Sequence, residues 1–286
     1  MLLPDYIAVV LRTLGFIGVL QAAGAVIFLA VFRSEHSEVL NTVSTLARRM
    51  AIVSLVLLVG TLAVEPARMA GEMAGIVDVS LISMVAASSL FLSMSVRVAG
   101  LILIAVTPRA RTPRERLVSL LGATLVAGSF ALTGHTSIHP LRWLLAPLLV
   151  VHLFVLAFWF GSLIPLWLVC RREAPRQAAR FVTRFSVMAV WLVPAILVAG
   201  IAMAFAIVPG WNVLREPYGL LLSSKVIGFS ALMVLAAANK WRFGSRLEQG
   251  DERAASNLRR IIVLEAILIG AVLAATATMT TFFSPE

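Results

Sequence analysis

Cysteine is almost absent from this sequence, since Cys170 is the only one among 286 residues. A single thiol excludes a disulfide framework and any motif built on paired cysteines, whether for metal binding or for redox chemistry. Cys170 lies beside Arg171 and Arg172, at the expected inner end of a helix. The simplest interpretation is an inert small residue.

Charged residues are also scarce, at 13% of the chain, whereas 60% of the residues are hydrophobic. A soluble domain is about half apolar and a quarter charged, so this composition predicts an integral membrane protein. The short alternating segments of a membrane barrel are missing. The net charge of +10 does not indicate nucleic-acid binding, because the basic residues are divided among several short loops.

Apolar runs recur along the chain, each long enough to cross a hydrocarbon core about 30 Å thick as a helix. We therefore expect an all-α polytopic bundle of about eight transmembrane helices. The expected spans are residues 7–32, 46–65, 79–106, 117–134, 142–169, 186–208, 217–239 and 259–283. The first span does not resemble a cleavable signal peptide, because it lacks a basic leader and is too long. We treat 1–286 as one transmembrane domain, with three spans in residues 1–116 and five in 117–286.

Lysine and arginine are distributed unequally between the two sets of loops. Residues 33–49, 107–116, 170–185 and 240–260 hold 3, 4, 5 and 6 of them, whereas the opposite loops hold Arg68, Arg142 and Arg215 alone. Such a bias places the basic loops in the cytoplasm, so both termini are expected to face outward. The longest inner loop is about 21 residues and no GxxxxGK[ST] motif occurs, so no nucleotide-driven pump is expected.

Three of the four histidines lie between residues 134 and 167. His135 and His139 occupy a polar turn on the expected outer side, and His152 lies about ten residues inside the next span. Imidazole is a common metal ligand, and an ionisable group within lipid suggests a functional site. An interhelical hydrogen bond is the alternative for His152, and a solvated turn the alternative for His135 and His139. Trp159, two turns below His152 on the same helical face, is either packing or part of a path.

Methionines provide a second type of ligand, because thioether sulfur suits Cu(I) and imidazole suits copper and zinc. Met69 and Met73 lie in an outer connection, and Met84 and Met94 lie in the third expected span. Methionine is also a routine filler of apolar gaps. The Met69/Met73 pair gains interest because it is expected on the same outward face as the His135/His139 pair.

Several other charges fall within the spans or at their ends. We expect Arg97 and Glu265 at similar levels, where they could form a buried ion pair that is structural or part of an ion path. Lys225 either extends to the headgroups or faces His152, where its charge would favour the neutral, metal-binding imidazole. Arg12 and Glu65 lie near the outer ends of the first two spans.

An ordered set of short motifs runs through the second half of the chain. The set comprises Leu132-Thr-Gly-His135, His152 with Trp159-Phe-Gly-Ser-Leu163, Arg184-Phe-Ser186, Pro217-Tyr-Gly219 with Lys225, Asn239, and Arg259-Arg260 with Glu265. With these motifs, residues 130–283 resemble the CopD family of bacterial inner-membrane copper proteins. The first four spans match that family in number and spacing.

The resemblance implies a protein of copper homeostasis that receives copper from a separate periplasmic carrier of the CopC type and passes it inward. The expected function is therefore a permease rather than an enzyme. Copper, as Cu(I) or Cu(II), would be collected by Met69, Met73, His135 and His139 and relayed by His152 through weak successive sites. Two alternatives stay open: a haem-binding electron-transfer protein of the cupric reductase kind, and a non-transporting assembly or signalling partner.

Overall fold

A computed structural model describes residues 2–35, 37–107, 112–207 and 216–283; within these ranges only the backbone is described for residues 135–136, 207, 217–218 and 238–245. Every long element in the described chain is a helix. The elements in order are α1 Leu3–Val31, α2 Val39–Ala70, η1 Met73–Val77, α3 Val79–Ala86, α4 Ser89–Val106, α5 Pro113–Ser129, η2 Phe130–Leu132, α6 His135–Ile138, α7 Arg142–Arg172, α8 Pro175–Ile207, α9 Pro217–Glu248 and α10 Glu252–Phe282.

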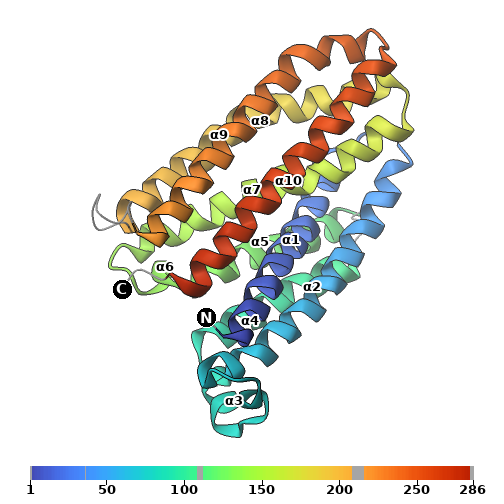
Figure 1. The fold of residues 1–286 in the computed structure, drawn as a ribbon. Helices are drawn as coiled ribbons and strands as arrows, with labels where there is room; N and C mark the ends of the chain where they lie inside the picture. The colour runs from blue at the N-terminus through green and yellow to red at the C-terminus, as the bar shows by residue number, and fades with distance from the viewer. Residues whose placement is uncertain (1, 36, 108–111, 208–215, 284–286) are drawn as a thin grey trace.

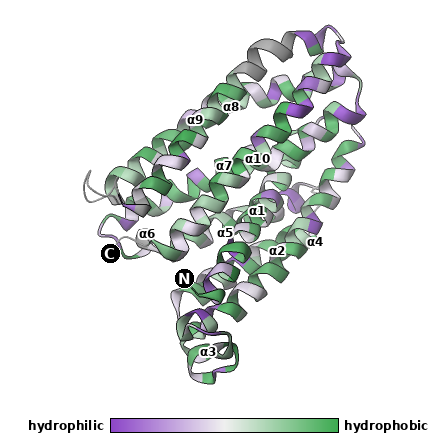
Figure 2. Cartoon of the chain, viewed as in Figure 1, coloured by the Kyte–Doolittle hydropathy of each residue, from purple (hydrophilic) through white to green (hydrophobic). Residues whose placement is uncertain are grey.

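Eight of these helices in the described chain are long and apolar enough to cross a membrane, namely α1, α2, α4, α5, α7, α8, α9 and α10. The expected all-α polytopic fold is confirmed. The two ends of the chain lie at the same end of the bundle, as an even number of spans requires (Figure 1). Hydrophilic residues gather at the opposite end, where α9 is followed by α10 (Figure 2).

The helices are longer than the apolar runs that predicted them. For example, α9 continues to Glu248 and α10 begins at Glu252, so most of the expected loop 240–260 is helical. The backbone hydrogen bonds of a helix continue past its first charged residue, whereas a span predicted from hydropathy ends there. Gly250, at φ 88°, makes the turn, and the Asp251 carboxylate caps α10 by accepting from the backbone N–H of Arg253 at 2.8 Å.

The third expected span, 79–106, is broken in two. α3 ends at Ala86 and α4 begins at Ser89, after Ser88 caps it by accepting from the backbone N–H of Phe91. α3 lies beyond the membrane-spanning helices, in a compact cap next to the start of α1 (Figure 1). Only the 18 residues of α4 therefore form the span.

The eight spanning helices form two four-helix units. In the N-terminal unit α1 packs on α2 and α5, and α4 packs on α2 and α5. In the C-terminal unit α7 packs on α8 and α10, and α9 packs on the same two helices. The units meet mainly where α1 contacts α7 and α10.

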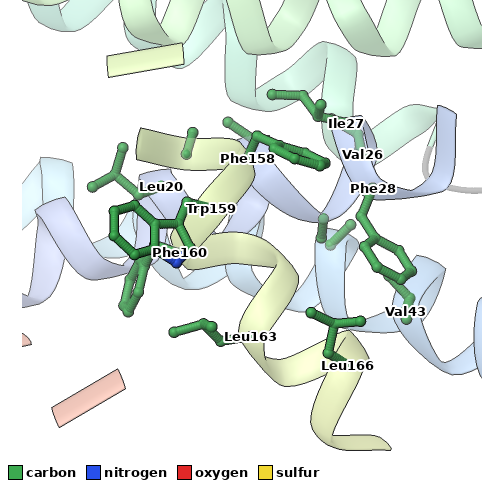
Figure 3. Close-up of a cluster of buried hydrophobic side chains, with 14 of the residues drawn as sticks. Leu20, Val26, Ile27, Phe28, Val43, Phe158, Trp159, Phe160, Leu163 and Leu166 are labelled. Carbon is green, nitrogen blue, oxygen red and sulfur yellow. The ribbon is translucent and has the colours of Figure 1, made fainter. Parts of the chain in front are cut away.

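The core lies at the crossing of α1 and α7. Figure 3 shows Leu20, Val26 and Phe28 of α1 near Phe158, Trp159 and Leu163 of α7, and these side chains are all buried. The two backbones touch, because a Cβ added to Gly161 would lie 2.5 Å from the Cα of Gly24. Small residues at such crossings allow the close approach that holds membrane helices together.

Candidate functional site

His152 lies on α7 in the outer half of the C-terminal unit and is partly buried. Its Nδ1 atom is 3.2 Å from the carbonyl oxygen of Ile196 on α8. Because a carbonyl can only accept, Nδ1 must carry the proton, and in the neutral ring Nε2 then presents a lone pair. Metal-binding histidines usually have this arrangement, in which one ring nitrogen donates to a carbonyl and the other binds the metal.

The interhelical hydrogen bond that sequence analysis gave as the alternative for His152 is therefore present. It does not exclude metal binding, since it engages only one of the two ring nitrogens. Gly200, one turn beyond Ile196, leaves space for the ring: a Cβ at Gly200 would lie 3.6 Å from Cε1 of His152. In the described part of the chain no hydrogen bond to Nε2 is found.

Two aromatic rings, from α7 and α9, pack together below His152. Trp159, 4% exposed, meets Phe229 of α9 edge to face, with ring centroids 6.3 Å apart. Trp159 lies about 10 Å below His152 along α7, at 1.5 Å per residue. The packing expected as one alternative for Trp159 is thus observed.

Lys225 lies one turn above Phe229 on α9, and residues four apart share a helical face. Since Phe229 meets Trp159, that face is turned toward α7. The Lys225 side chain is itself partly buried. Of the two alternatives for Lys225, the geometry favours the one in which it faces the bundle.

Of the two histidines in the outer turn, His139 has a described side chain, and that side chain is bonded to the backbone. Nδ1 of His139 accepts a hydrogen bond from the backbone N–H of Leu141 at 3.0 Å, next to the start of α7. His139 thereby satisfies a backbone donor at a helix start. The side chain of His135 lies outside the described residues, and only its backbone, in α6, is placed.

The methionine pair and the histidine turn are on separate elements. Met69 is near the end of α2 and Met73 begins η1, which packs on α2 and α3. α6 packs on α7 and η2 instead. Within the described ranges no group of three or more His, Cys, Asp or Glu side chains is arranged to hold a metal ion.

The ion pair suggested between Arg97 and Glu265 is not formed. The Arg97 guanidinium donates to Ser129 Oγ at 2.9 Å and to Ser93 Oγ at 3.5 Å, and its Cζ lies 3.7 Å from the centre of the Phe130 ring. These partners belong to α4, α5 and η2 of the N-terminal unit. Glu265 is buried on α10, which packs on α7, α9 and α1.

The error arose from the depth of Arg97. Counted from residue 79, Arg97 falls in the inner half of its span; counted from Ser89, where α4 begins, it lies eight residues in. Its partners Ser129 and Phe130, at the outer end of α5, place it in the outer half. The interruption at Ser88 therefore moves the guanidinium toward the end of the bundle where both ends of the chain lie.

Sequence analysis noted Arg12 and Glu65 but missed the cluster that they form at the outer end. Arg12 is 3.6 Å from the Glu65 carboxylate and donates to the Thr280 carbonyl at 3.1 Å and to Thr281 Oγ at 3.2 Å. Arg68 bonds Glu65 at 2.8 Å and the Thr281 carbonyl at 3.3 Å. This outer clasp ties α1 and α2 to the end of α10, and two basic residues there suit the carbonyl end of that helix.

Cys170 is buried, and its carbonyl accepts a hydrogen bond from Arg259 at 3.2 Å. Nothing in the described surroundings gives the thiol another ligand group to act with. The interpretation as an inert small residue agrees with this environment.

Two family comparisons cover most of the chain. Residues 3–140 match the family described as copper resistance protein D-like, N-terminal domain, and residues 179–279 match the family described as copper resistance protein D. The chain belongs to the copper resistance protein D family. It is thus a copper resistance membrane protein, and the resemblance first seen in the second half extends to the first.

The two family matches correspond roughly to the two halves of the fold. The N-terminal domain match covers α1 to α6, the copper resistance protein D match covers most of α8, α9 and α10, and α7 with His152 lies between them. The chain is also similar to inner membrane protein YebZ of Escherichia coli (strain K12), with 32% identity over 108 residues. That alignment covers 37% of each protein, about a third of the relative's length. No solved structure matches the chain.

Proposed function

We propose that this family member carries copper across the bacterial inner membrane, from the periplasm to the cytoplasm, and that Nε2 of His152 is its intramembrane ligand. The observation that carries the proposal is the bond from Nδ1 of His152 to the Ile196 carbonyl. That bond fixes the ring and leaves one nitrogen with a lone pair inside a four-helix unit. The name of the YebZ relative supports the inner-membrane location.

The sparse ligand set supports transit rather than storage. A path for an ion needs sites weak enough to release it, and one imidazole with few neighbouring donors is a weak site. Copper is the cargo here, and the protein acts as a permease, not as an enzyme. We propose a separate periplasmic carrier of the CopC type as the donor.

The test is copper flux into proteoliposomes made with wild type and His152→Asn. The Asn side chain can donate to the Ile196 carbonyl in place of Nδ1 but has no group at the Nε2 position. We expect flux to fall to the level of empty liposomes while the folded yield stays that of wild type. Leu153→Ala, on the same helix at the same depth, is the matched control. Wild-type flux in His152→Asn would reject the relay.

A further inference from the structure

The exposed methionines of the described chain all lie in one short segment. Met69, Met73 and Met84 are 47%, 38% and 56% exposed, whereas the other described methionines are buried or partly buried. A buried methionine fills gaps in a core, but an exposed thioether fills none. Met84 lies on α3, which is not one of the spans, and Val77, Val79 and Ile82 of the same segment are also exposed.

The segment folds into a small outer cap, defined here as residues 69–88. Gly71 turns the chain at φ 77°, and η1 then packs back on α2: a Cβ at Gly75 would lie 2.5 Å from Cβ of Ala70. α3 contacts both α2 and η1. Figure 1 shows this part of the chain as one compact body beyond the start of α1. The fold thus packs against one another the three elements that carry Met69, Met73 and Met84.

The outer cap is anionic in a chain whose net charge is +10. It contains Glu72 and Asp78 and no Lys, Arg, His or Cys. The Asp78 carboxylate is already used at the start of α3, where it accepts from the backbone N–H groups of Ser80 at 2.8 Å and Leu81 at 3.2 Å. Thioether sulfur is therefore the main ligand that the cap offers, and thioethers select Cu(I) over Cu(II) or Zn(II).

We propose that Met69, Met73 and Met84 form a Cu(I) site in the outer cap. The methionine side chain has three rotatable bonds, which allows thioethers on neighbouring elements to converge on one ion. The His135/His139 turn is not part of this site, because α6 packs on α7 and η2 and not on the cap. As a first stop for copper the site rests on the proposed function, whereas its binding of Cu(I) is independent of it.

The test is Cu(I) binding to the full chain in detergent, measured against a competing Cu(I) chelator. Each of Met69→Leu, Met73→Leu and Met84→Leu is expected to weaken the affinity about tenfold or more, as loss of a metal-site residue does. Met203→Leu and Met233→Leu, partly buried in α8 and α9, are the controls and are expected to bind as wild type does. X-ray absorption is expected to show sulfur neighbours, and the affinity to be equal at pH 5.5 and 7.5, because a thioether has no proton to exchange.

Wild-type affinity in all three cap variants, equal loss in the controls, the absence of sulfur neighbours, or no Cu(I) binding to the wild-type chain would each overturn the proposal. His152→Asn separates it from the proposed function, since that variant keeps the outer cap. Normal Cu(I) affinity with normal flux in His152→Asn would reject the relay and leave the cap site standing. Loss of affinity in His152→Asn would show that the measured Cu(I) is not in the cap.

Discussion

The N-terminal and C-terminal units have the same number of helices but differ in how closely those helices pack. In the N-terminal unit α4 and α5 touch backbone to backbone, since a Cβ at Gly100 would lie 2.6 Å from the Gly122 carbonyl oxygen. Two-thirds of the most apolar stretch of α1 is buried, compared with 11% for α8 and 6% for α9. Most residues in the apolar stretches of α8 and α9 are thus exposed or only partly buried.

The two units also treat buried polar groups differently. Arg97 in the N-terminal unit has two hydroxyl acceptors and an aromatic ring against its guanidinium. His152 in the C-terminal unit has one ring nitrogen bonded and one with a lone pair. Within the membrane, therefore, the buried Arg97 of the N-terminal unit is held by its neighbours, whereas the proposed ligand His152 of the C-terminal unit keeps one ring nitrogen for copper.

The largest expected effect is at the contact between the units. Gly24→Ala adds a methyl group that overlaps the backbone of Ala157 and Gly161, so the helices must separate. We expect a loss of about 3 kcal/mol or more in unfolding free energy, as for severe overpacking. Thermal unfolding in detergent measures it. Gly270→Ala on α10, where a Cβ meets no atom within 4 Å, is the control; equal loss in both would show that the crossing is not tight.

The outer clasp ties the two units together and gives the next effect. Arg12→Met removes the ion pair with Glu65 and the bonds to Thr280 and Thr281, all in a partly buried setting. We expect a loss of about 2 kcal/mol, typical of hydrogen bonds to a charged group. Hydrogen exchange should increase at the outer end of α10 but not in α4 or α5. Arg142→Met, exposed at the start of α7, controls for loss of charge, and unchanged exchange in α10 would argue against the clasp.

Hydropathy and charge predicted the number of spans and the all-α class, because both depend on composition summed over long windows. They missed the break between α3 and α4, since two N-caps, Asp78 and Ser88, lie within an apolar stretch that averaging treats as continuous. That one omission misplaced Arg97 in depth and produced the wrong partner for it.

The candidate site was predicted as a set of residue types but not as an arrangement. The sequence identified His152 as a titratable group in a span, and its spacing from Trp159 placed both on one face. It did not predict the Ile196 carbonyl as a partner, because every residue has such a carbonyl and only helix packing selects one. The sequence likewise identified Arg12 and Glu65 as charged residues at the ends of spans. It did not predict the bonds from Arg12 to Thr280 and Thr281, because they depend on α10 being a neighbour.

A smaller effect on stability, with a larger one on flux, is expected inside the C-terminal unit. Gly200→Leu extends a side chain toward the His152 ring, which lies 3.6 Å from a Cβ at that position. Since few residues of α8 are buried, we expect the helix to shift. The loss in unfolding free energy should be less than about 1.5 kcal/mol, within the range of tolerated core changes. Copper flux should fall because the ring loses its space. Gly200→Ala makes only an ordinary contact and is expected to transport as wild type does; a Leu variant with full flux would remove Gly200 from the path.

The smallest effect concerns pH in the outer cap. Hydrogen bonds from the Ser80 hydroxyl and from the backbone N–H groups of Leu81 and Ser80 lower the pKa of the Asp78 carboxyl below its ordinary value. A carboxyl with a lowered pKa stabilises the folded state above its unfolded pKa, about 3.9, and loses that contribution as the pH falls through the folded value. The start of α3 should therefore be unchanged from pH 8 to 5 and loosen only in stronger acid. Hydrogen exchange at Ser80 and Leu81 measures this. Asp78→Asn, which cannot ionise, is expected to abolish the acid step, and an acid step that persists in that variant would assign it to another group.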